Sequence, residues 1–349
     1  MKIIHCADVH LGSRMNRLPK DKAEERAREI RLSFERMITF AKEEGIDTIL
    51  LAGDIFDSDR PFKKDKEFFY SAVRRNPEIT FFYLRGNHDD KESYTEEIEN
   101  LKTFGTEWTS YTLGWNVVLS GIEIDRGNCL SMYSSLRLDP NNHNIVMLHG
   151  QAGEAFGENK VCIPRLKNRN IDYLALGHIH RQGAAQLDER GISAYSGCLE
   201  GRGFDEIGEK GFMVYDTDTR EVSFVSFASR IVEERVVDVS GAKDGYEVAD
   251  KIKREVKIEK KNLLRLYLTG EIDFVDEKLA EDVEKYVSDI CYFVSVKDNT
   301  RLKIDYSVFE DSLSLKGEFV RLVKSENMSD SDRQKILDLG LRALTGQVD

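Results

Sequence analysis

Five clusters of potential metal ligands lie within the first 180 residues of the chain. They contain five of its seven histidines. The clusters are Asp8-Val9-His10, Gly53-Asp54, Gly86-Asn87-His88-Asp89, Leu148-His149-Gly150 and Gly177-His178-Ile179-His180. Carboxylate, amide and imidazole donors without thiolates suit first-row dications such as manganese, iron or zinc better than calcium or a structural zinc. One such residue alone is more often a cap or a satisfied polar group, but five clusters together predict a shared metal site.

Each cluster directly follows a short apolar stretch that is typical of a buried strand. The predicted strands are residues 3–7, 48–52, 80–84, 144–148 and 173–176. Ligands of open α/β sheets bind beyond the carboxyl ends of the strands, so the five clusters are expected to converge on one crevice. Because residues two apart in a strand share a face, Asp8 should point to the same place as His10. The same spacing relates His178 to His180.

The other elements indicate two domains, as the length of 349 residues also favours. Residues 21–44 have apolar side chains at helical spacing and stop at Gly45, which predicts a helix covering the sheet. Alternating stretches at 211–215 and 222–227 predict antiparallel strands that complete a second sheet. From residue 231 onward no histidine occurs. This part is predicted to be a smaller α/β domain with a strand at 263–268 and helices at 277–290 and 331–344.

The net charge of −12 argues against a protein that coats nucleic acid by bulk attraction. Two local stretches are basic: residues 14–36 hold eight basic and five acidic residues, and residues 60–75 hold six and two. Each stretch could border a DNA groove or could be a solvated helix face. The five cysteines form no Cys-x-x-Cys pair, and no signal peptide or membrane span is apparent, so a cytoplasmic location is expected.

In their order and composition, the five clusters resemble the motifs of the calcineurin-like metallophosphoesterases. Within that superfamily, Gly53-Asp54-Ile55-Phe56-Asp57 and the glycine-rich residues 196–206 resemble the bacterial SbcD-like DNA repair exonucleases. Some archaeal and eukaryotic relatives carry a histidine where this chain has Asp57. The resemblance implies an α/β fold, a two-sheet sandwich flanked by helices in four layers. It also implies a catalytic domain at 1–230, a DNA-binding α/β cap domain at 231–305, and a helical segment at 306–349 for partner docking.

The same resemblance implies a site for two divalent metal ions, with manganese preferred and iron, magnesium or zinc as alternatives. One ion would be held by Asp8, His10, Asp54 and His180, and the other by Asp54, Asn87, His149 and His178. His88 would contact the phosphate and protonate the leaving oxygen, with Asp89 orienting it through a hydrogen bond. The expected DNA contacts are Arg60, Lys63, Lys64, Lys66 and Arg202.

These expectations together predict a metal-dependent DNA nuclease that acts in DNA repair with a coiled-coil SbcC-like ATPase, and a homodimer is a further expected assembly. Two alternatives remain open from the sequence. The same ligands would serve an enzyme that cleaves a small phosphodiester or a phosphoprotein. A scaffold that kept the fold and lost the chemistry would lack ligands, and none of the expected ligands is missing.

Overall fold

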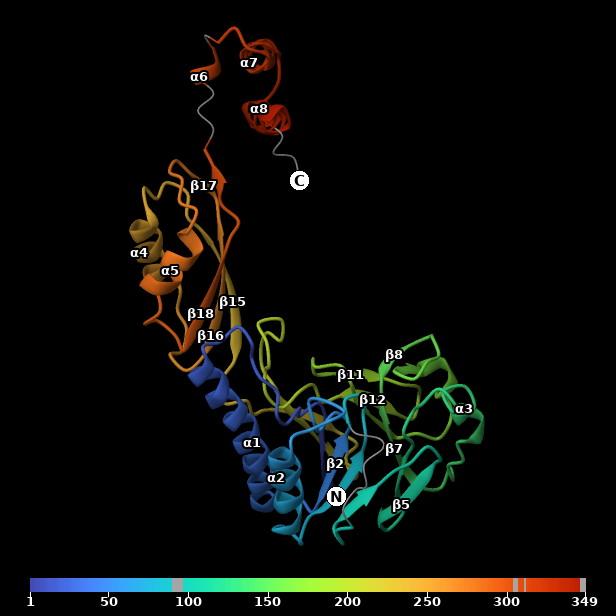
Figure 1. Cartoon of the computed structure of the whole chain (residues 1–349). Helices are drawn as coiled ribbons and strands as arrows, with labels where there is room; N and C mark the ends of the chain where they lie inside the picture. The colour runs from blue at the N-terminus through green and yellow to red at the C-terminus, as the bar shows by residue number, and fades with distance from the viewer. Residues whose placement is uncertain (90–96, 304–306, 311, 346–349) are drawn as a thin grey trace. The chain divides into compact units, whose positions relative to one another are not determined.

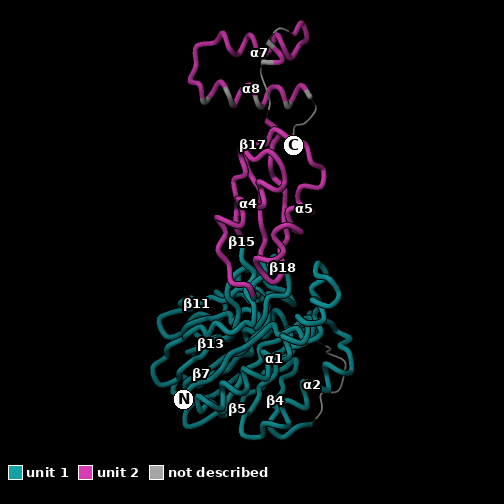
Figure 2. The backbone as a smooth tube through the Cα atoms, turned by 90° about the vertical axis from the view of Figure 1, so that its left-hand side faces the viewer, with its two compact units in different colours: residues 1–233, 261–263 teal, residues 234–260, 264–349 magenta. Residues whose placement is uncertain are grey.

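The computed structural model describes residues 1–89, 97–303, 307–310 and 312–345. The chain divides into two compact units, residues 1–233 with 261–263 and residues 234–260 with 264–349 (Figure 2). The functions expected for the segments 1–230, 231–305 and 306–349 stay predictions. Among the described helices, none has the length and apolar character needed to cross a membrane.

The first sheet of unit 1 contains three of the predicted strands. Its order is β14 (Val222–Ser226), β13 (Gly211–Asp216), β1 (Lys2–Cys6), β2 (Thr48–Ala52), β3 (Thr80–Leu84) and β4 (Leu101–Thr103). The strands β1 to β4 run parallel, and β13 pairs antiparallel with β1, so that Met213 lies opposite His5. The expectation that residues 211–227 complete a second sheet was therefore wrong. Alternation along the sequence identifies a strand but not its partner, and these two strands extend the first sheet.

The second sheet contains the other two predicted strands. Its order is β11 (Gly183–Gln186), β12 (Ile192–Tyr195), β10 (Tyr173–Gly177), β7 (His143–His149), β6 (Val117–Gly121) and β5 (Thr109–Gly114). The four central strands are parallel and the two edge strands are antiparallel to their neighbours. A short pair, β8 (Gln151–Gly153) and β9 (Lys160–Cys162), follows β7.

The two sheets pack face to face, and both faces of the central strands are buried. In β2, Ile49 and Leu51 contact the helices α1 (Lys20–Glu43) and α2 (Lys63–Arg74), which cover the outer face of the first sheet (Figure 1). Leu50 and Ala52 alternate with them and contact the second sheet. The short helix α3 (Met132–Ser135) and the 3-10 helix η1 (Ile163–Arg165) lie on the outside of the second sheet. The predicted two-sheet sandwich flanked by helices is confirmed.

Unit 2 has its own core. A three-stranded sheet of β15 (Val232–Asp238), β16 (Leu263–Thr269) and β18 (Phe293–Asp298) packs against α4 (Gly245–Glu255) and α5 (Leu279–Tyr286). The remaining elements are the pair β17 (Glu271–Ile272) and β19 (Arg301–Leu302) and the helices α6 (Ser307–Glu310), α7 (Leu315–Ser325) and α8 (Asp330–Thr345). Apolar residues alternate in β16, where Leu264, Leu266 and Leu268 face this core. The helix predicted at 277–290 is shorter than expected.

Candidate metal centre

The ligands expected from the sequence lie on the loops that follow β1, β2, β3 and β10 and, for His149, at the last residue of β7. The loops after β1 and β2 are joined by backbone hydrogen bonds from Asp8 N–H to Gly53 O (3.0 Å) and from His10 N–H to Asp54 O (3.0 Å). Asp8, His10 and Asp54 have φ angles of 52°, 50° and 53°. This left-handed conformation is unusual for such residues and is typical of functional sites. Since β1 ends at Cys6, strand alternation does not bring Asp8 and His10 together; the turned loop does.

Two glycines allow the loops to approach one another. A Cβ atom on Gly53, whose φ is 94°, would lie 2.2 Å from His149 Nδ1. A Cβ atom on Gly86 would lie 2.2 Å from Asp54 Oδ1. Any larger residue at either position would displace a potential ligand.

Asp8, His10 and His180 form a first group of potential ligands. His10 Nε2 lies 3.3 Å from His180 Nε2, and His180 Nε2 lies 3.7 Å from Asp8 Oδ1. Asp8 and His10 are fully buried. Asp54 Oδ2 lies 3.9 Å from His10 Nε2, so its carboxylate also faces this group.

The second group contains Asp54, His149 and His178. Asp54 Oδ2 lies 3.3 Å from His149 Nε2. Asn87 completes the group because its Oδ1 atom lies 3.1 Å from His149 Nε2 and 2.9 Å from His178 Nδ1. The structure therefore brings together all seven expected metal ligands, and Asp54 faces both groups.

The electrostatics of these groups match a site built for cations. Burial raises the pKa of the Asp8 carboxyl to about 6. Burial also opposes ionisation of Asp54, but the hydrogen bond with His149, the charges of His149 and His10 and the backbone N–H of His88 together outweigh it and hold the pKa of Asp54 below its usual range. Burial lowers the pKa of His10 to about 2, which keeps its imidazole neutral. Its neighbour Asp54 has the opposite effect on His149, because their hydrogen bond and charge attraction outweigh burial and raise the pKa of that imidazole to about 9. Imidazole nitrogens, two carboxylates and one amide oxygen are a donor set that fits two divalent cations.

Contacts outside the two groups orient their members. His149 Nδ1 lies 2.8 Å from the carbonyl oxygen of Ala52. An Nδ1–H donor at this position leaves Nε2 to face Asp54 and Asn87. The backbone N–H of His88 donates to Asp54 Oδ1 at 2.8 Å and fixes the carboxylate that both groups share.

The residues expected to act in catalysis occupy different environments. The His88 side chain is exposed, and its ring lies edge-on to that of His10 with 5.2 Å between centroids. Asp89 is buried, and its two oxygens accept the backbone N–H groups of Phe56 and Gly86, each at 2.9 Å. The expected orientation of His88 by Asp89 stays a prediction. Asp89 holds the loops after β2 and β3 together, and so acts on the position of Asp54 and Asn87.

The model of the family described as calcineurin-like phosphoesterase matches residues 1–182, more than half of the 349 residues. The chain belongs to the calcineurin-like phosphoesterase family. The family resemblance drawn from the five clusters is confirmed, and the two ligand groups lie inside the matched region.

Several curated relatives are similar to this phosphoesterase over most of its length. The DNA double-strand break repair protein Mre11 of Sulfurisphaera tokodaii is 24% identical over 98% of this chain and 93% of the relative. The protein of the same name from Thermoplasma acidophilum is 25% identical over 81% of this chain and 80% of the relative. The uncharacterized metallophosphoesterase YhaO of Bacillus subtilis is 27% identical over 70% of this chain and 64% of the relative.

Arg202, for which a DNA contact stays a prediction, lies beside the first ligand group with only 18% of its side chain exposed. Its guanidinium lies 2.7 Å from Asp57 Oδ1 and 3.2 Å from Glu206 Oε1, and also 3.1 Å from His180 Nδ1. Glu206 lies in the glycine-rich stretch, but no role is predicted for it from the sequence. The stretch could be recognised as a motif, whereas the contact between Glu206 and His180, 26 residues apart, could not.

A third group of potential ligands contains His180, Cys198 and Glu206. The Arg202 guanidinium contacts His180 and Glu206, and its positive charge disfavours a metal cation between them. Burial raises the pKa of the Cys198 thiol well above its usual range, which disfavours the thiolate that a metal requires. This group therefore supports His180 from outside the centre. Beside it, a cavity of about 720 Å³ is lined by His180, Arg181 and Lys210, among others.

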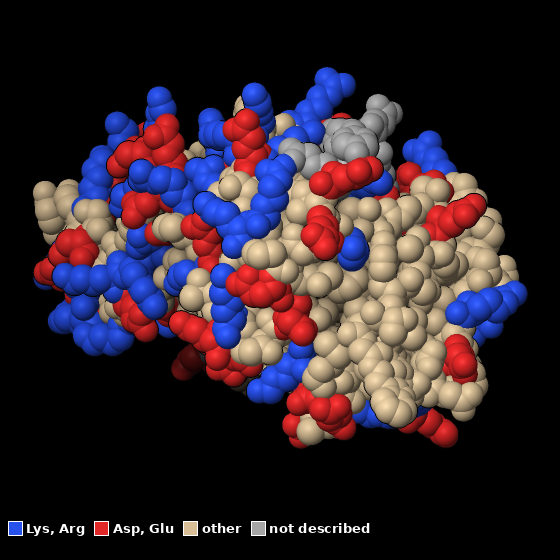
Figure 3. Space-filling model, turned by 90° about the horizontal axis from the view of Figure 1, so that it is seen from below, with Lys and Arg blue, Asp and Glu red and all other residues tan. Residues whose placement is uncertain are grey.

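The expected DNA contacts other than Arg202 lie on the loop after β2 and in the first turn of α2. Arg60, Lys63 and Lys64 are exposed and Lys66 is half-buried. The exposed ring of Phe62 lies 5.6 Å from Lys64 Nζ. The basic residues of 14–36 have a different environment, because several pair with acids, as Arg31 does with Asp65 at 2.8 Å. Figure 3 shows the same intermixing of charges on the side of α1 and α2, with few charges on the side of β5 and β7.

Proposed function

We propose that this phosphoesterase is a metal-dependent DNA nuclease that acts as an exonuclease in DNA repair, with manganese as the preferred metal. The observation that carries the proposal is the pair of ligand groups that share Asp54, in a chain similar over nearly its whole length to a DNA double-strand break repair protein. When bound, two divalent cations activate a water molecule and neutralise charge that develops on the phosphodiester.

The chain's own residues would divide the remaining work. Asp54 would hold both cations, with its orientation fixed by the backbone N–H of His88. The exposed His88 imidazole lies beside His10 and would donate a proton to the leaving oxygen as a general acid. Asp89 would act as a positioning residue that keeps the loops after β2 and β3 at their separation.

A nuclease assay tests the substrate directly. Linear duplex DNA labelled at either the 5′ or the 3′ end, incubated with the protein and Mn²⁺, should release labelled products from one end first. The order of release also gives the polarity of digestion. Hydrolysis of a small phosphodiester without any cleavage of duplex ends would contradict the nuclease proposal. It would support the alternative enzyme that cleaves a small phosphodiester. A protein that binds Mn²⁺ and hydrolyses neither would support the scaffold.

Arg60, Lys63, Lys64 and Lys66 would hold the DNA backbone close to the metal centre, because they follow Asp54 on the same loop and the next helix. Replacing Lys63, Lys64 and Lys66 by glutamate should weaken DNA cleavage at least about 10-fold at low salt, since each phosphate contact releases counterions. Hydrolysis of a chromogenic phosphodiester should be unchanged. The difference from wild type should shrink as salt rises.

The matched control reverses the charges of Lys2 and Lys42. These lysines lie at the start of β1 and in the last turn of α1, away from the ends of the strands that carry the ligands. This control should leave both activities unchanged. An equal loss on DNA and on the small substrate in the triple variant would show that the lysines support the fold or the metal centre instead.

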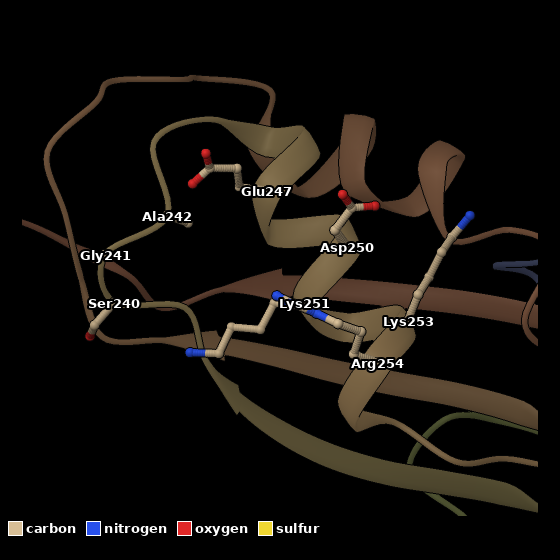
Figure 4. A pocket seen from close by; sticks show the side chains of 8 residues that line it. All are labelled: Ser240, Gly241, Ala242, Glu247, Asp250, Lys251, Lys253 and Arg254. Atoms are coloured by element: carbon tan, nitrogen blue, oxygen red, sulfur yellow. The ribbon is translucent and has the colours of Figure 1, made fainter.

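Unit 2 would add DNA contacts as a cap domain. A pocket of about 620 Å³ in this unit is lined by α4 and by the loop that carries Ser240. Lys251 and Arg254 extend toward that loop, whereas Lys253 points to the other side of α4 (Figure 4). Lys251 and Arg254 would supply the cations for a phosphate of the DNA backbone, beside the carboxylates of Glu247 and Asp250 that line the same pocket.

The C-terminal helices would bind the coiled-coil ATPase. The apolar residues of α8 divide into two sets: Leu337 and Leu341 pack on Val320 and Val323 of α7, while Ile336 and Leu339 remain 40% and 67% exposed. One apolar face of α8 is therefore buried against α7, and the side chains of Ile336 and Leu339 stay exposed. Exposed apolar residues three apart on a helix are suited to a groove between a partner's helices.

Replacing Ile336 and Leu339 by glutamate should abolish co-purification of the ATPase from the native cell and leave small-substrate hydrolysis intact. Deleting residues 326–349 should have the same effect on co-purification. The point variants keep Leu337 and Leu341, so they should fold with the wild-type melting temperature. ATPase retained by both variants would place the docking site elsewhere.

A further inference from the structure

The ring nitrogen Nδ1 of His180, the outer nitrogen that does not face Asp8 and His10, contacts a carboxylate of the glycine-rich stretch. Glu206 Oε1 lies 2.6 Å from His180 Nδ1. With Nδ1–H donating to this carboxylate, Nε2 is left unprotonated and faces Asp8 and His10. The contact therefore selects the tautomer that a metal ligand needs.

Arg202 connects this carboxylate to a second one. Its side chain donates to Asp57 Oδ1 at 2.7 Å and to Glu206 Oε1 at 3.2 Å, and its backbone N–H donates to Glu206 Oε2 at 2.6 Å. Asp57 Oδ1 in turn lies 3.5 Å from His10 Nδ1. We call Asp57, Arg202 and Glu206 the outer bracket. It reaches the outer nitrogens of both histidines in the first ligand group.

The base of the glycine-rich stretch is anchored in the core of unit 1. Glu200 is buried and accepts hydrogen bonds from Arg26 at 2.9 Å, from Ser33 Oγ at 2.5 Å and from the backbone N–H of Ser229 at 2.6 Å. Arg26 also donates to the carbonyl oxygen of Gly201 at 3.0 Å. A buried charge that is paired and fully hydrogen-bonded fixes the backbone next to Arg202.

In the part of the chain that the structure describes, the outer bracket contacts His180 but no member of the second ligand group. Its His149 is oriented by the carbonyl oxygen of Ala52. The two ligand groups are therefore supported by different parts of the chain, although Asp54 faces both. A change in the outer bracket should act on one group alone.

We propose that Glu206 and Arg202 are positioning residues that set the metal affinity of the group formed by Asp8, His10 and His180, independently of the other group. This inference rests on the proposed metal ligation, but not on the identity of the substrate. Loss of a carboxylate that supports a metal-binding histidine costs about 10- to 100-fold in metal affinity. Glu206→Gln removes the charge and keeps the size of the side chain.

Calorimetric titration of the full chain with Mn²⁺ tests the proposal. Wild type should bind two ions. In Glu206→Gln, one dissociation constant should rise about 10- to 100-fold and the other should stay unchanged. At Mn²⁺ concentrations between the two constants, the variant should give the electron paramagnetic resonance spectrum of isolated Mn²⁺, whereas wild type should give that of a coupled pair. Raising the Mn²⁺ concentration should restore kcat on a chromogenic phosphodiester.

Glu189→Gln makes the same chemical change at an exposed position between β11 and β12, and should bind both ions as wild type does. Arg202→Lys keeps the charge but loses the fork of donors, and should weaken the same ion less than Glu206→Gln does. Wild-type affinities in both bracket variants, or equal weakening of both ions, would overturn the proposal. A wild-type chain that binds fewer than two ions would overturn it together with the metal centre. Selective weakening in a protein that cuts no DNA would support it and contradict only the nuclease.

Discussion

Asp54→Asn should reduce hydrolysis of both DNA and a chromogenic phosphodiester by on the order of 10³-fold or more, because the carboxylate faces both ligand groups and its charge serves both cations. Asparagine keeps the size of the side chain and an oxygen that can still accept from the backbone N–H of His88. The fold should therefore survive. The measurements are kcat/KM on both substrates and the number of Mn²⁺ ions bound.

The matched control for this prediction is Asp47→Asn, an exposed aspartate directly before the opposite end of β2. It should leave both activities and Mn²⁺ binding unchanged. If Asp54→Asn bound two ions with wild-type affinity and kept its activity, Asp54 would not be shared between the cations. The proposed centre would then need a different bridging group.

His88→Asn should lower kcat on DNA by about 10²- to 10⁴-fold, the range expected when a general acid is lost. Mn²⁺ binding should stay at the wild-type level, because the His88 side chain is exposed and belongs to neither ligand group. The backbone N–H that orients Asp54 is also kept. This combination separates His88 from the ligands themselves.

The leaving group sharpens the test of His88. A nitrophenolate leaves without protonation, whereas the alkoxide of a DNA strand needs a proton. The loss in His88→Asn should therefore be much smaller on a chromogenic phosphodiester than on DNA. Equal losses on both substrates would assign His88 to phosphate binding rather than to proton transfer. His143→Asn serves as the control, because it replaces a histidine at the start of β7, the end of the strand away from the ligand His149.

The sequence by itself determined the strands of the sandwich and the residues of the metal centre. In β2 and β10 the apolar run is continuous, because both faces are buried, and the polar residues begin where the strand ends. These are local signals, carried by neighbours in the chain. They were sufficient to predict all seven side chains that the structure brings into two groups.

Only the tertiary structure decided which strands pair and how the ligands turn toward one another. Antiparallel β13 and β14 could have joined either sheet, and the choice depends on contacts with β1 more than 200 residues away. The left-handed backbone at Asp8, His10 and Asp54 is imposed by hydrogen bonds between the loops after β1 and β2. No local pattern encodes such strain, because the surrounding fold has to maintain it.

The contacts of the residues around the candidate metal centre could likewise not be predicted from the sequence. Asp89 follows His88 directly, so adjacency suggested that the two interact, but the carboxylate accepts one backbone N–H group from its own loop, at Gly86, and one from the loop after β2, at Phe56. The family resemblance of its glycine-rich loop predicts a DNA contact for Arg202. Its partner Asp57 is 145 residues away, so only the folded chain brings this cation beside the first ligand group, 3.1 Å from His180 Nδ1. Residue type and spacing specify which groups can bind a metal, whereas the groups that orient them are set by distances that only the folded chain creates.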